Sequence, residues 1–173
     1  MAERNRLVRI GAADFIRDQA AARLDPFPEI VLDRLHDFLF DCSGAVRHSL
    51  ATALYHAGNL TSVAALKRLV QEEPDSAMVR ETAEVAALRC WQRGALIKDV
   101  PLEPPALSLV SSNVLLAIEM HRLAKQAGCR LVFPEPQTLD LAVFPAAVRV
   151  VNRCEMGIDA WKPFVEFGQD SAP

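Results

Sequence analysis

Two stretches of the chain read alike, Asp41-Cys-Ser-Gly-Ala-Val-Arg47 and Asp75-Ser-Ala-Met-Val-Arg80. Each begins with an aspartate, passes through small residues and reaches a Val-Arg pair, after which an alanine-rich segment of helical character follows. The two Val-Arg pairs lie 33 residues apart, as Arg47 and Arg80 show. A period of roughly 30–45 residues built of amphipathic helix pairs is typical of an α-solenoid, in which one pair buries its faces only when a neighbour stacks on it.

Around this repeat the hydrophobic spacing predicts helices. A first helix is expected over 7–24, before the break at Asp25-Pro-Phe-Pro28, and Pro28 suits the first turn of the next one. Ser43 is a candidate N-cap for a third helix, Thr61 or Ser62 for a fourth, and Gly58 ends the third. The predicted ranges after Pro28 are 28–39, 45–57, 62–72 and 77–92.

The stretch from Ala53 to Arg80 resembles a HEAT repeat of the short type found in phycobilisome lyases. In that family an aspartate in the turn within the repeat and an arginine early in the second helix are similar to Asp75 and Arg80, and to Asp41 and Arg47. The resemblance covers about residues 26–93 and implies a hydrogen-bonded ladder between repeats, with a structural role. The first copy departs from the pattern, because its aspartate and arginine are six positions apart instead of five. Lyase activity is not implied.

The second half has a different character. Pro101-Leu-Glu-Pro-Pro105 reads as a stiff linker, which predicts one domain over 1–100 and another over 101–173. A strand, a helix and a second strand are expected at 106–110, 114–127 and 129–133, with Ser111, Ser112 and Asn113 capping the helix and Gly128 ending it. Their natural geometry is a parallel crossover. The expected fold is therefore mainly α, a short HEAT-like α-solenoid followed by a small α/β region.

The last forty residues allow two interpretations. Strands are predicted at 139–144 and 148–151 and a closing helix at 159–167, but one helix over 138–154 is an alternative. The segment from the first strand to Gly128 faintly resembles the opening of a bacterial receiver domain. Such domains bind magnesium through an acidic pair, whereas this chain has Ser111, Ser112 and Asn113, so the resemblance implies a remnant that takes no phosphate.

Composition excludes several classes of function. The 173 residues carry 19 basic and 22 acidic side chains, a net charge of −3, which argues against nucleic-acid binding. We expect no membrane span, because no apolar run approaches 18 residues. Cys42, Cys90, Cys129 and Cys154 form no closely spaced pair, which argues against a zinc or thiol redox site. The first residues resemble a mixed-charge helix and not an export signal, so free thiols and a cytoplasmic location are expected. A metal shared by His48 and His56 is a minor alternative, and no cofactor is predicted.

The sequence predicts a class of function and no specific reaction or ligand. We expect no enzyme, because the sequence lacks a phosphate-binding glycine loop and a nucleophile elbow. The favoured function is a scaffold that binds another protein, with His48, Tyr55 and Glu84 as candidate contacts and Arg47 and Arg80 as structural residues. The alternatives are a sensory protein with a degenerate receiver-like half, and a small lyase-type enzyme.

Overall fold

The structure is a computed structural model that describes residues 2–23, 25–94, 106–133, 147–151 and 164–166. Within these residues the chain is mainly helical, as predicted. It divides into two compact units, Met1–Ile97 and Lys98–Pro173, each of which is considered by itself. The predicted boundary after residue 100 and the predicted linker at 101–105 lie outside the described residues.

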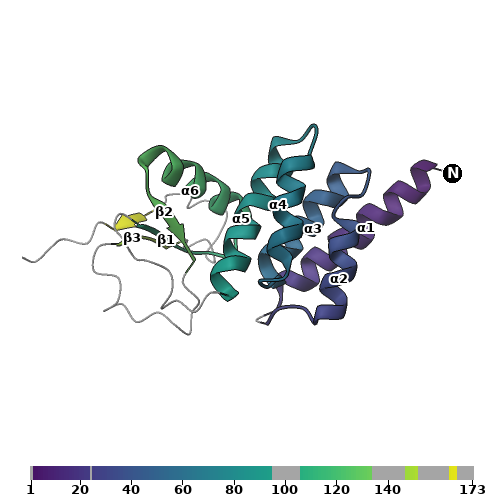
Figure 1. Ribbon diagram of the computed structural model, residues 1–173, viewed down its shortest axis with the longest axis horizontal. Coiled ribbons are helices and arrows are strands. Elements are labelled where there is room, and N and C mark those ends of the chain that lie inside the picture. Colours follow the sequence, from purple (N-terminus) through teal and green to yellow (C-terminus); the bar gives the residue numbers. More distant parts are fainter. Residues whose placement is uncertain (1, 24, 95–105, 134–146, 152–163, 167–173) are drawn as a thin grey trace, which may run out of the picture. The chain divides into compact units, whose positions relative to one another are not determined.

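Five helices form the described part of the first unit (Figure 1), and they lie in two layers. In one layer α3 packs against α1 on one side and α5 on the other. In the second layer α4 packs on α5 and contacts α2. The helices are α1 (Ala2–Ala21), α2 (Glu29–Phe38), α3 (Gly44–Ala57), α4 (Ser62–Glu72) and α5 (Ala77–Gly94).

The middle helix, α3, forms the centre of the core. Nine of its 14 residues are buried, including the polar Ser49 and Thr52. A helix that is covered on nearly all sides needs small or apolar residues all round, and the alanine-rich sequence of α3 supplies them. Its alanines also allow α1 to approach closely, because Ala53 and Ala57 pack with Ala20 of α1 in one buried cluster.

The ends of α3 and α4 differ from the expected capping. Ser43 and Thr61 occupy the N-cap positions as predicted, but neither side chain makes a capping hydrogen bond. Ser43 instead donates its main-chain N–H to the carboxylate of Asp41, at 2.7 Å. The Thr61 hydroxyl donates to Oδ1 of Asn59, at 2.6 Å. A carboxylate or amide two residues earlier thus organises each of these turns.

Gly58 ends α3 for a reason of packing. Its φ of −79° is open to any residue, so the backbone conformation does not require glycine here. A Cβ at this position would lie 2.5 Å from the main-chain oxygen of Leu54 and 2.6 Å from Sγ of Cys90. The glycine is therefore needed because the last turn of α3 and Cys90 of α5 together fill the space that a side chain would occupy.

The described part of the second unit contains one helix and a sheet of four short strands. The helix α6 (Val114–Ala127) has the predicted bounds; Asn113 caps it, and Gly128 ends it in a left-handed conformation with φ of 66°. The sheet has the order β2-β1-β3-β4, with β1 parallel to β2 and β3, and β4 antiparallel to β3. The strands are β1 (Ala106–Val110), β2 (Arg130–Val132), β3 (Ala147–Val151) and β4 (Phe164–Glu166).

Two expectations for the C-terminal region were wrong where the structure describes it. Residues 164–166, placed in a closing helix, form β4 and pair with Arg149–Val151 of β3. The alternative helix over 138–154 is contradicted at 147–151, which form β3. Main-chain pairing with distant strands satisfies the N–H and carbonyl groups that a helix would have satisfied locally. The predicted strand at 139–144 lies outside the described residues.

Among the helices that the structure describes, none combines the length and the apolar character that a bilayer crossing requires.

Candidate functional site

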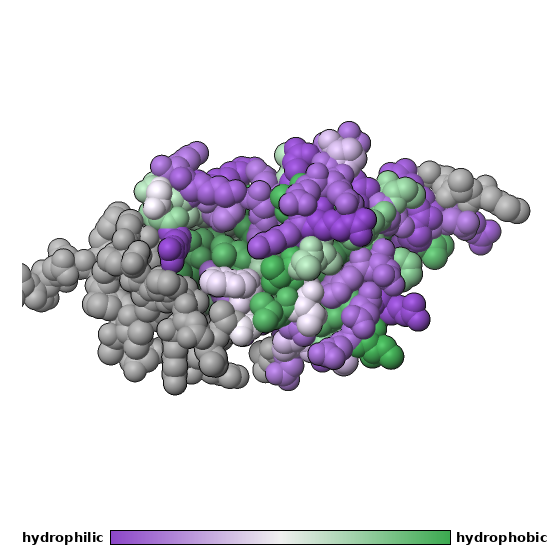
Figure 2. Space-filling view, viewed as in Figure 1, coloured by the Kyte–Doolittle hydropathy of each residue, from purple (hydrophilic) through white to green (hydrophobic). Residues whose placement is uncertain are grey.

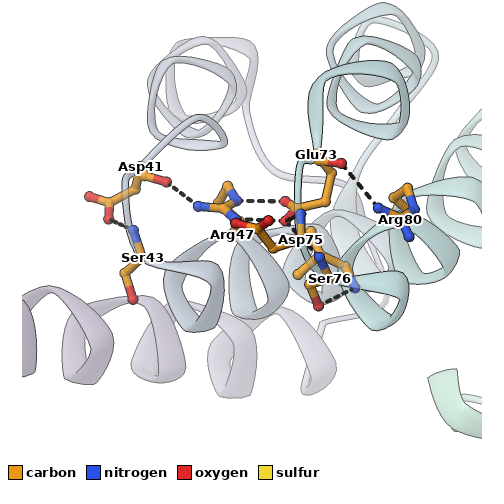
Figure 3. A network of polar contacts seen from close by, with 8 residues as sticks. Asp41, Ser43, Arg47, Glu73, Asp75, Ser76 and Arg80 are labelled. Atoms are coloured by element: carbon orange, nitrogen blue, oxygen red, sulfur yellow. Dashed lines mark hydrogen bonds and ion pairs between the residues drawn. The ribbon is translucent and has the colours of Figure 1, made fainter.

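A connected polar network of the first unit centres on Arg47, in the first turn of α3 (Figure 3). Its Nε and Nη2 donate to the two carboxylate oxygens of Glu73, each at 2.7 Å, which makes a bidentate ion pair. Its Nη1 donates to the main-chain oxygen of Asp41, also at 2.7 Å. One guanidinium group therefore joins the turn before α3 to the turn before α5.

Glu73 was not among the predicted site residues, although it is central to this network. Its side chain is completely buried. Its Oε1 also accepts the main-chain N–H groups of Ser76, at 3.2 Å, and Asp75, at 3.4 Å. The hydrogen bonds from Arg47 lower the pKa of the Glu73 carboxyl group and outweigh the opposing effect of burial. The same hydrogen bonds raise the pKa of Arg47.

Glu73, and not Asp75, makes the contacts in the second turn that Asp41 makes in the first. Both carboxylates accept the N–H of the residue two positions later, Ser43 in one turn and Asp75 in the other. Arg80 Nη1 donates to the main-chain oxygen of Glu73, at 3.1 Å, as Arg47 does to that of Asp41. The Asp75 main chain supports the turn, while its carboxylate only adds to the raised pKa of Arg47. The spacing still differs between the two turns, because Asp41 and Arg47 are six positions apart whereas Glu73 and Arg80 are seven apart.

The network also reaches α1. Nε of Arg9 forms an ion pair with Oδ2 of Asp41, at 2.8 Å, and its Nη2 contacts Sγ of Cys42, at 3.3 Å. The polar chain thus runs from α1 through Asp41 and Arg47 to Glu73 and Arg80. Apart from Arg9, which lies in the interior of α1, these residues lie at helix starts or in turns, where main-chain groups lack helical partners.

Tyr55, a predicted partner contact, is fully buried, so this prediction was wrong. It lies on α3, which other helices cover on both sides, and its large ring therefore packs inside. The Arg89 guanidinium lies 4.5 Å from the centre of the Tyr55 ring, and the His56 ring meets it edge-on at 5.2 Å. Arg93 donates to the main-chain oxygens of Gly58, at 2.8 Å, and Tyr55, at 3.4 Å, and so caps the end of α3.

The other two predicted contacts, His48 and Glu84, are partly buried on α3 and α5. Burial lowers the pKa of His48, and nearby Arg17 of α1 adds to this effect. Next to His48 along α3, the hydroxyl of Ser49 donates to Asp14 Oδ1 at 2.7 Å. Both predicted residues thus retain accessible surface, in contrast to Tyr55.

The described residues provide neither a cluster of metal ligands nor an activated thiol at Cys90. They contain no group of three or more His, Cys, Asp or Glu side chains that could hold a metal ion. Burial, together with the nearby Arg89 and Arg93, lowers the pKa of His56 to about 4; this residue was proposed with His48 as a minor metal site. Burial also raises the pKa of the Cys90 thiol to about 12, so this thiol is a poor nucleophile.

The polar residues that follow β1 cap the start of α6. Oδ1 of Asn113 accepts the N–H groups of Leu115, at 3.0 Å, and Leu116, at 3.2 Å. Asn113 in turn donates its own N–H to the hydroxyl of Ser111, at 3.0 Å. The capping role expected for this cluster is confirmed.

Comparisons of the chain with protein-family models, with curated proteins and with solved structures gave no match. The HEAT-like and receiver-like resemblances therefore stay predictions, and the proposals below rest on the geometry of the chain itself.

Proposed function

We propose that this protein is a protein-binding module, a short α-solenoid of HEAT-like helix pairs followed by a small α/β region. The observation that carries the proposal is the repeated contact between an arginine and a turn. Arg47 and Arg80, 33 residues apart, each donate to the main-chain oxygen of the acidic residue that opens the preceding turn. The Arg47–Glu73 pair then joins one such turn to the next.

This network supports a scaffold function because its contacts lie on inner helix surfaces and in turns, where they stabilise the fold. In stacked helix pairs each unit contacts its neighbours, and the outer helix faces are left for binding. The polar groups of the network hold one another and main-chain atoms, as expected of a structural ladder. On the face shown in Figure 2, hydrophilic side chains predominate over α4, and hydrophobic ones appear in smaller patches.

The binding surface that we propose lies on α5. Glu84, Leu88 and Trp91 follow one another at helical spacing on the side of α5 that is less buried, and Trp91 is exposed. We call these three residues the α5 stripe. Tryptophan is enriched among the residues that contribute most to protein–protein binding, because its large ring buries much apolar surface.

The test is affinity capture from the native cell with the full chain as bait, followed by quantitative mass spectrometry. We expect one protein to be captured in near-stoichiometric amount, and its recovery to fall about tenfold with Trp91→Ala or Glu84→Lys. The matched control is Glu72→Lys, which reverses an exposed charge on α4 that pairs only with Arg68 on the same helix. Circular dichroism would establish that all variants fold.

Two outcomes would contradict the proposal. One is the absence of any stoichiometric partner in repeated captures from native cells. The other is a captured protein whose recovery is the same with the α5 stripe variants as with the Glu72→Lys control. Binding of the purified partner, measured by calorimetry with the same three variants, would separate direct contacts from indirect ones.

A further inference from the structure

The outer side of α1 is apolar, although the end helix of a packed array usually needs a polar outer face. Leu7, Val8 and Phe15 are 62%, 65% and 65% exposed. They lie opposite Ala13 and Ala20, which are buried on the inner side of the same helix. We call this outer face the α1 stripe; it comprises Arg4, Leu7, Val8, Gly11, Phe15 and Asp18, all exposed.

Gly11, at the centre of the stripe, has no purpose within the fold of one chain. It lies in the interior of α1, where glycine weakens a helix relative to alanine. Among the described residues, and apart from the backbone of α1 itself, a Cβ at this position would meet no heavy atom within 4 Å, so no neighbour there requires its absence. A glycine on an exposed helix face permits another backbone to approach closely. Gly11 therefore points to a helix that packs across α1 from outside.

The charges of the stripe indicate which helix this is. Arg4 and Asp18 lie seven positions before and after Gly11, and Leu7 and Phe15 lie four positions before and after it. In an antiparallel pair of α1 helices that cross at Gly11, each Arg4 faces Asp18 of the other copy and each Leu7 faces Phe15. Both contacts of Asp18 with Arg17 of its own helix use Oδ1 alone.

We propose that the protein self-associates through the α1 stripe, as a two-fold symmetric pair of antiparallel α1 helices that cross at Gly11. A two-fold axis through the stripe makes every contact occur twice, which is the usual arrangement of homodimers. A parallel pair would place Arg4 against Arg4 and Asp18 against Asp18, so the charges select the antiparallel one. The proposal is independent of the protein-binding function, which uses the α5 stripe.

The interface is small, and the affinity should be modest. The helical rise places Arg4 and Asp18 about 21 Å apart along α1. A contact of this length on one helix buries less surface than the standard interface of roughly 800 Å² per partner. We expect a dissociation constant on the order of 10 μM, with monomers prevailing at low micromolar concentration. Sedimentation velocity over a range from about 1 μM to about 500 μM would measure it.

The first variant is Phe15→Glu, which places a charge in the middle of the apolar stripe. We expect it to remain monomeric throughout this range of concentration. Its matched control is Phe38→Glu, because Phe38 is also exposed, at 57%, but lies on α2. The control should dimerise like the wild type. Equal self-association of the two variants would overturn the proposal, as would a wild-type protein that is monomeric at about 500 μM.

A mixing experiment tests the antiparallel arrangement. Arg4→Glu alone should dimerise at least tenfold more weakly, because each new glutamate faces Asp18 of the other copy, and Asp18→Lys alone should do so because each lysine faces Arg4. An equimolar mixture of these two variants should form a heterodimer with an affinity close to that of the wild type, since both facing pairs are then of opposite charge. A mixture no stronger than the separate variants would overturn the proposed pairing.

Discussion

At the scale of single residues, the carboxylate of Glu73 is the group on which the contact between helix pairs depends. It is completely buried, and Arg47 provides its two shortest hydrogen bonds. A buried carboxylate is tolerated when its charge is paired and its oxygens accept hydrogen bonds. If the pair is broken on one side, the remaining charge keeps its desolvation cost without compensation.

We therefore expect Arg47→Ala to destabilise the first unit by about 3 kcal/mol, because it leaves Glu73 buried beside only two main-chain donors. Urea unfolding followed by circular dichroism measures this. Glu72→Ala is the control, because it breaks an exposed ion pair of α4 while Arg68 keeps its place over the Phe40 ring, and it should leave the unfolding midpoint nearly unchanged. If the two variants behaved alike, Arg47 would not have the structural role assigned to it.

The second prediction at this scale concerns pH and His56. The pKa of His56 is about 4 in the folded chain and near 6.5 in an unfolded one. Between these values the unfolded state binds a proton that the folded state does not, so the stabilising effect is complete above pH 6.5 and declines as the pH falls towards 4. His36 and His48, whose pKa values burial also lowers, contribute in the same direction.

His56→Gln should consequently lose less stability than the wild type when the pH falls from about 7 to about 4.5. The measurement is the urea midpoint of both proteins at the two pH values. His36 and His48 are common to both proteins, so their effect cancels in the difference. Parallel pH profiles would show that His56 titrates normally.

At the scale of elements, the close contact between the end of α3 and Cys90 of α5 depends on the absence of a side chain at Gly58. Cys90 of α5 donates to the main-chain oxygen of Leu54 at 3.3 Å, directly under Gly58. A Cβ at Gly58 would clash both with this Leu54 oxygen of α3 itself and with the Cys90 sulfur of α5, so both would have to shift. The close approach also brings Arg93 within reach of the last carbonyl groups of α3.

We expect Gly58→Ala to lower the free energy of unfolding by about 1–3 kcal/mol through overpacking, measured by urea unfolding. Gly44→Ala serves as the matched control, because a Cβ there would meet only Arg47 Nη2, at 3.6 Å, an ordinary contact distance. A Gly58→Ala variant as stable as the wild type would show that α3 and α5 can separate at little cost.

At the scale of the whole molecule, the first unit should fold by itself. Its five helices make their packing contacts with one another: α3 against α1 and α5, and α4 against α5. A fragment of residues 1–97 is expected to keep its helical circular dichroism and to unfold cooperatively on heating. A fragment of residues 1–72 lacks α5, which covers both α3 and α4, and should not unfold cooperatively. Loss of cooperativity in the longer fragment would contradict the division into two units.

How far the fold could be predicted depends on the distance over which its contacts act. The helices α2 to α6 were predicted to within two residues, because periodic burial and helix stops are local patterns, whereas α1 begins five residues earlier than predicted. Asn113 and Gly128 show this most clearly, since each acts on groups within four residues of itself. Residues 164–166 were placed in a helix because their partner strand lies some fifteen residues earlier, where no local pattern indicates it.

The candidate site shows the same limit. Arg47 could be selected as structural from the repeat, but Glu73, 26 residues away, could not be recognised as its partner. The signal that could have identified Glu73 is that an acidic residue opens each turn, Asp41 in the first and Glu73 in the second. Asp75 obscured this signal, because it is an aspartate like Asp41 and lies in the same turn as Glu73. Tyr55 was expected at the surface because spacing alone does not show that α3 is covered on both sides.

The sequence by itself determined where the helices of this protein begin and end, because capping, helix stops and apolar periodicity act within a turn or two of the chain. Only the tertiary structure decided which carboxylate meets Arg47, why Gly58 must lack a side chain, and that Tyr55 lies inside while Leu7 and Phe15 lie outside. These outcomes depend on which helix faces pack together. That choice is made by shape and desolvation between segments far apart in the chain, and it leaves no local pattern in the order of the residues.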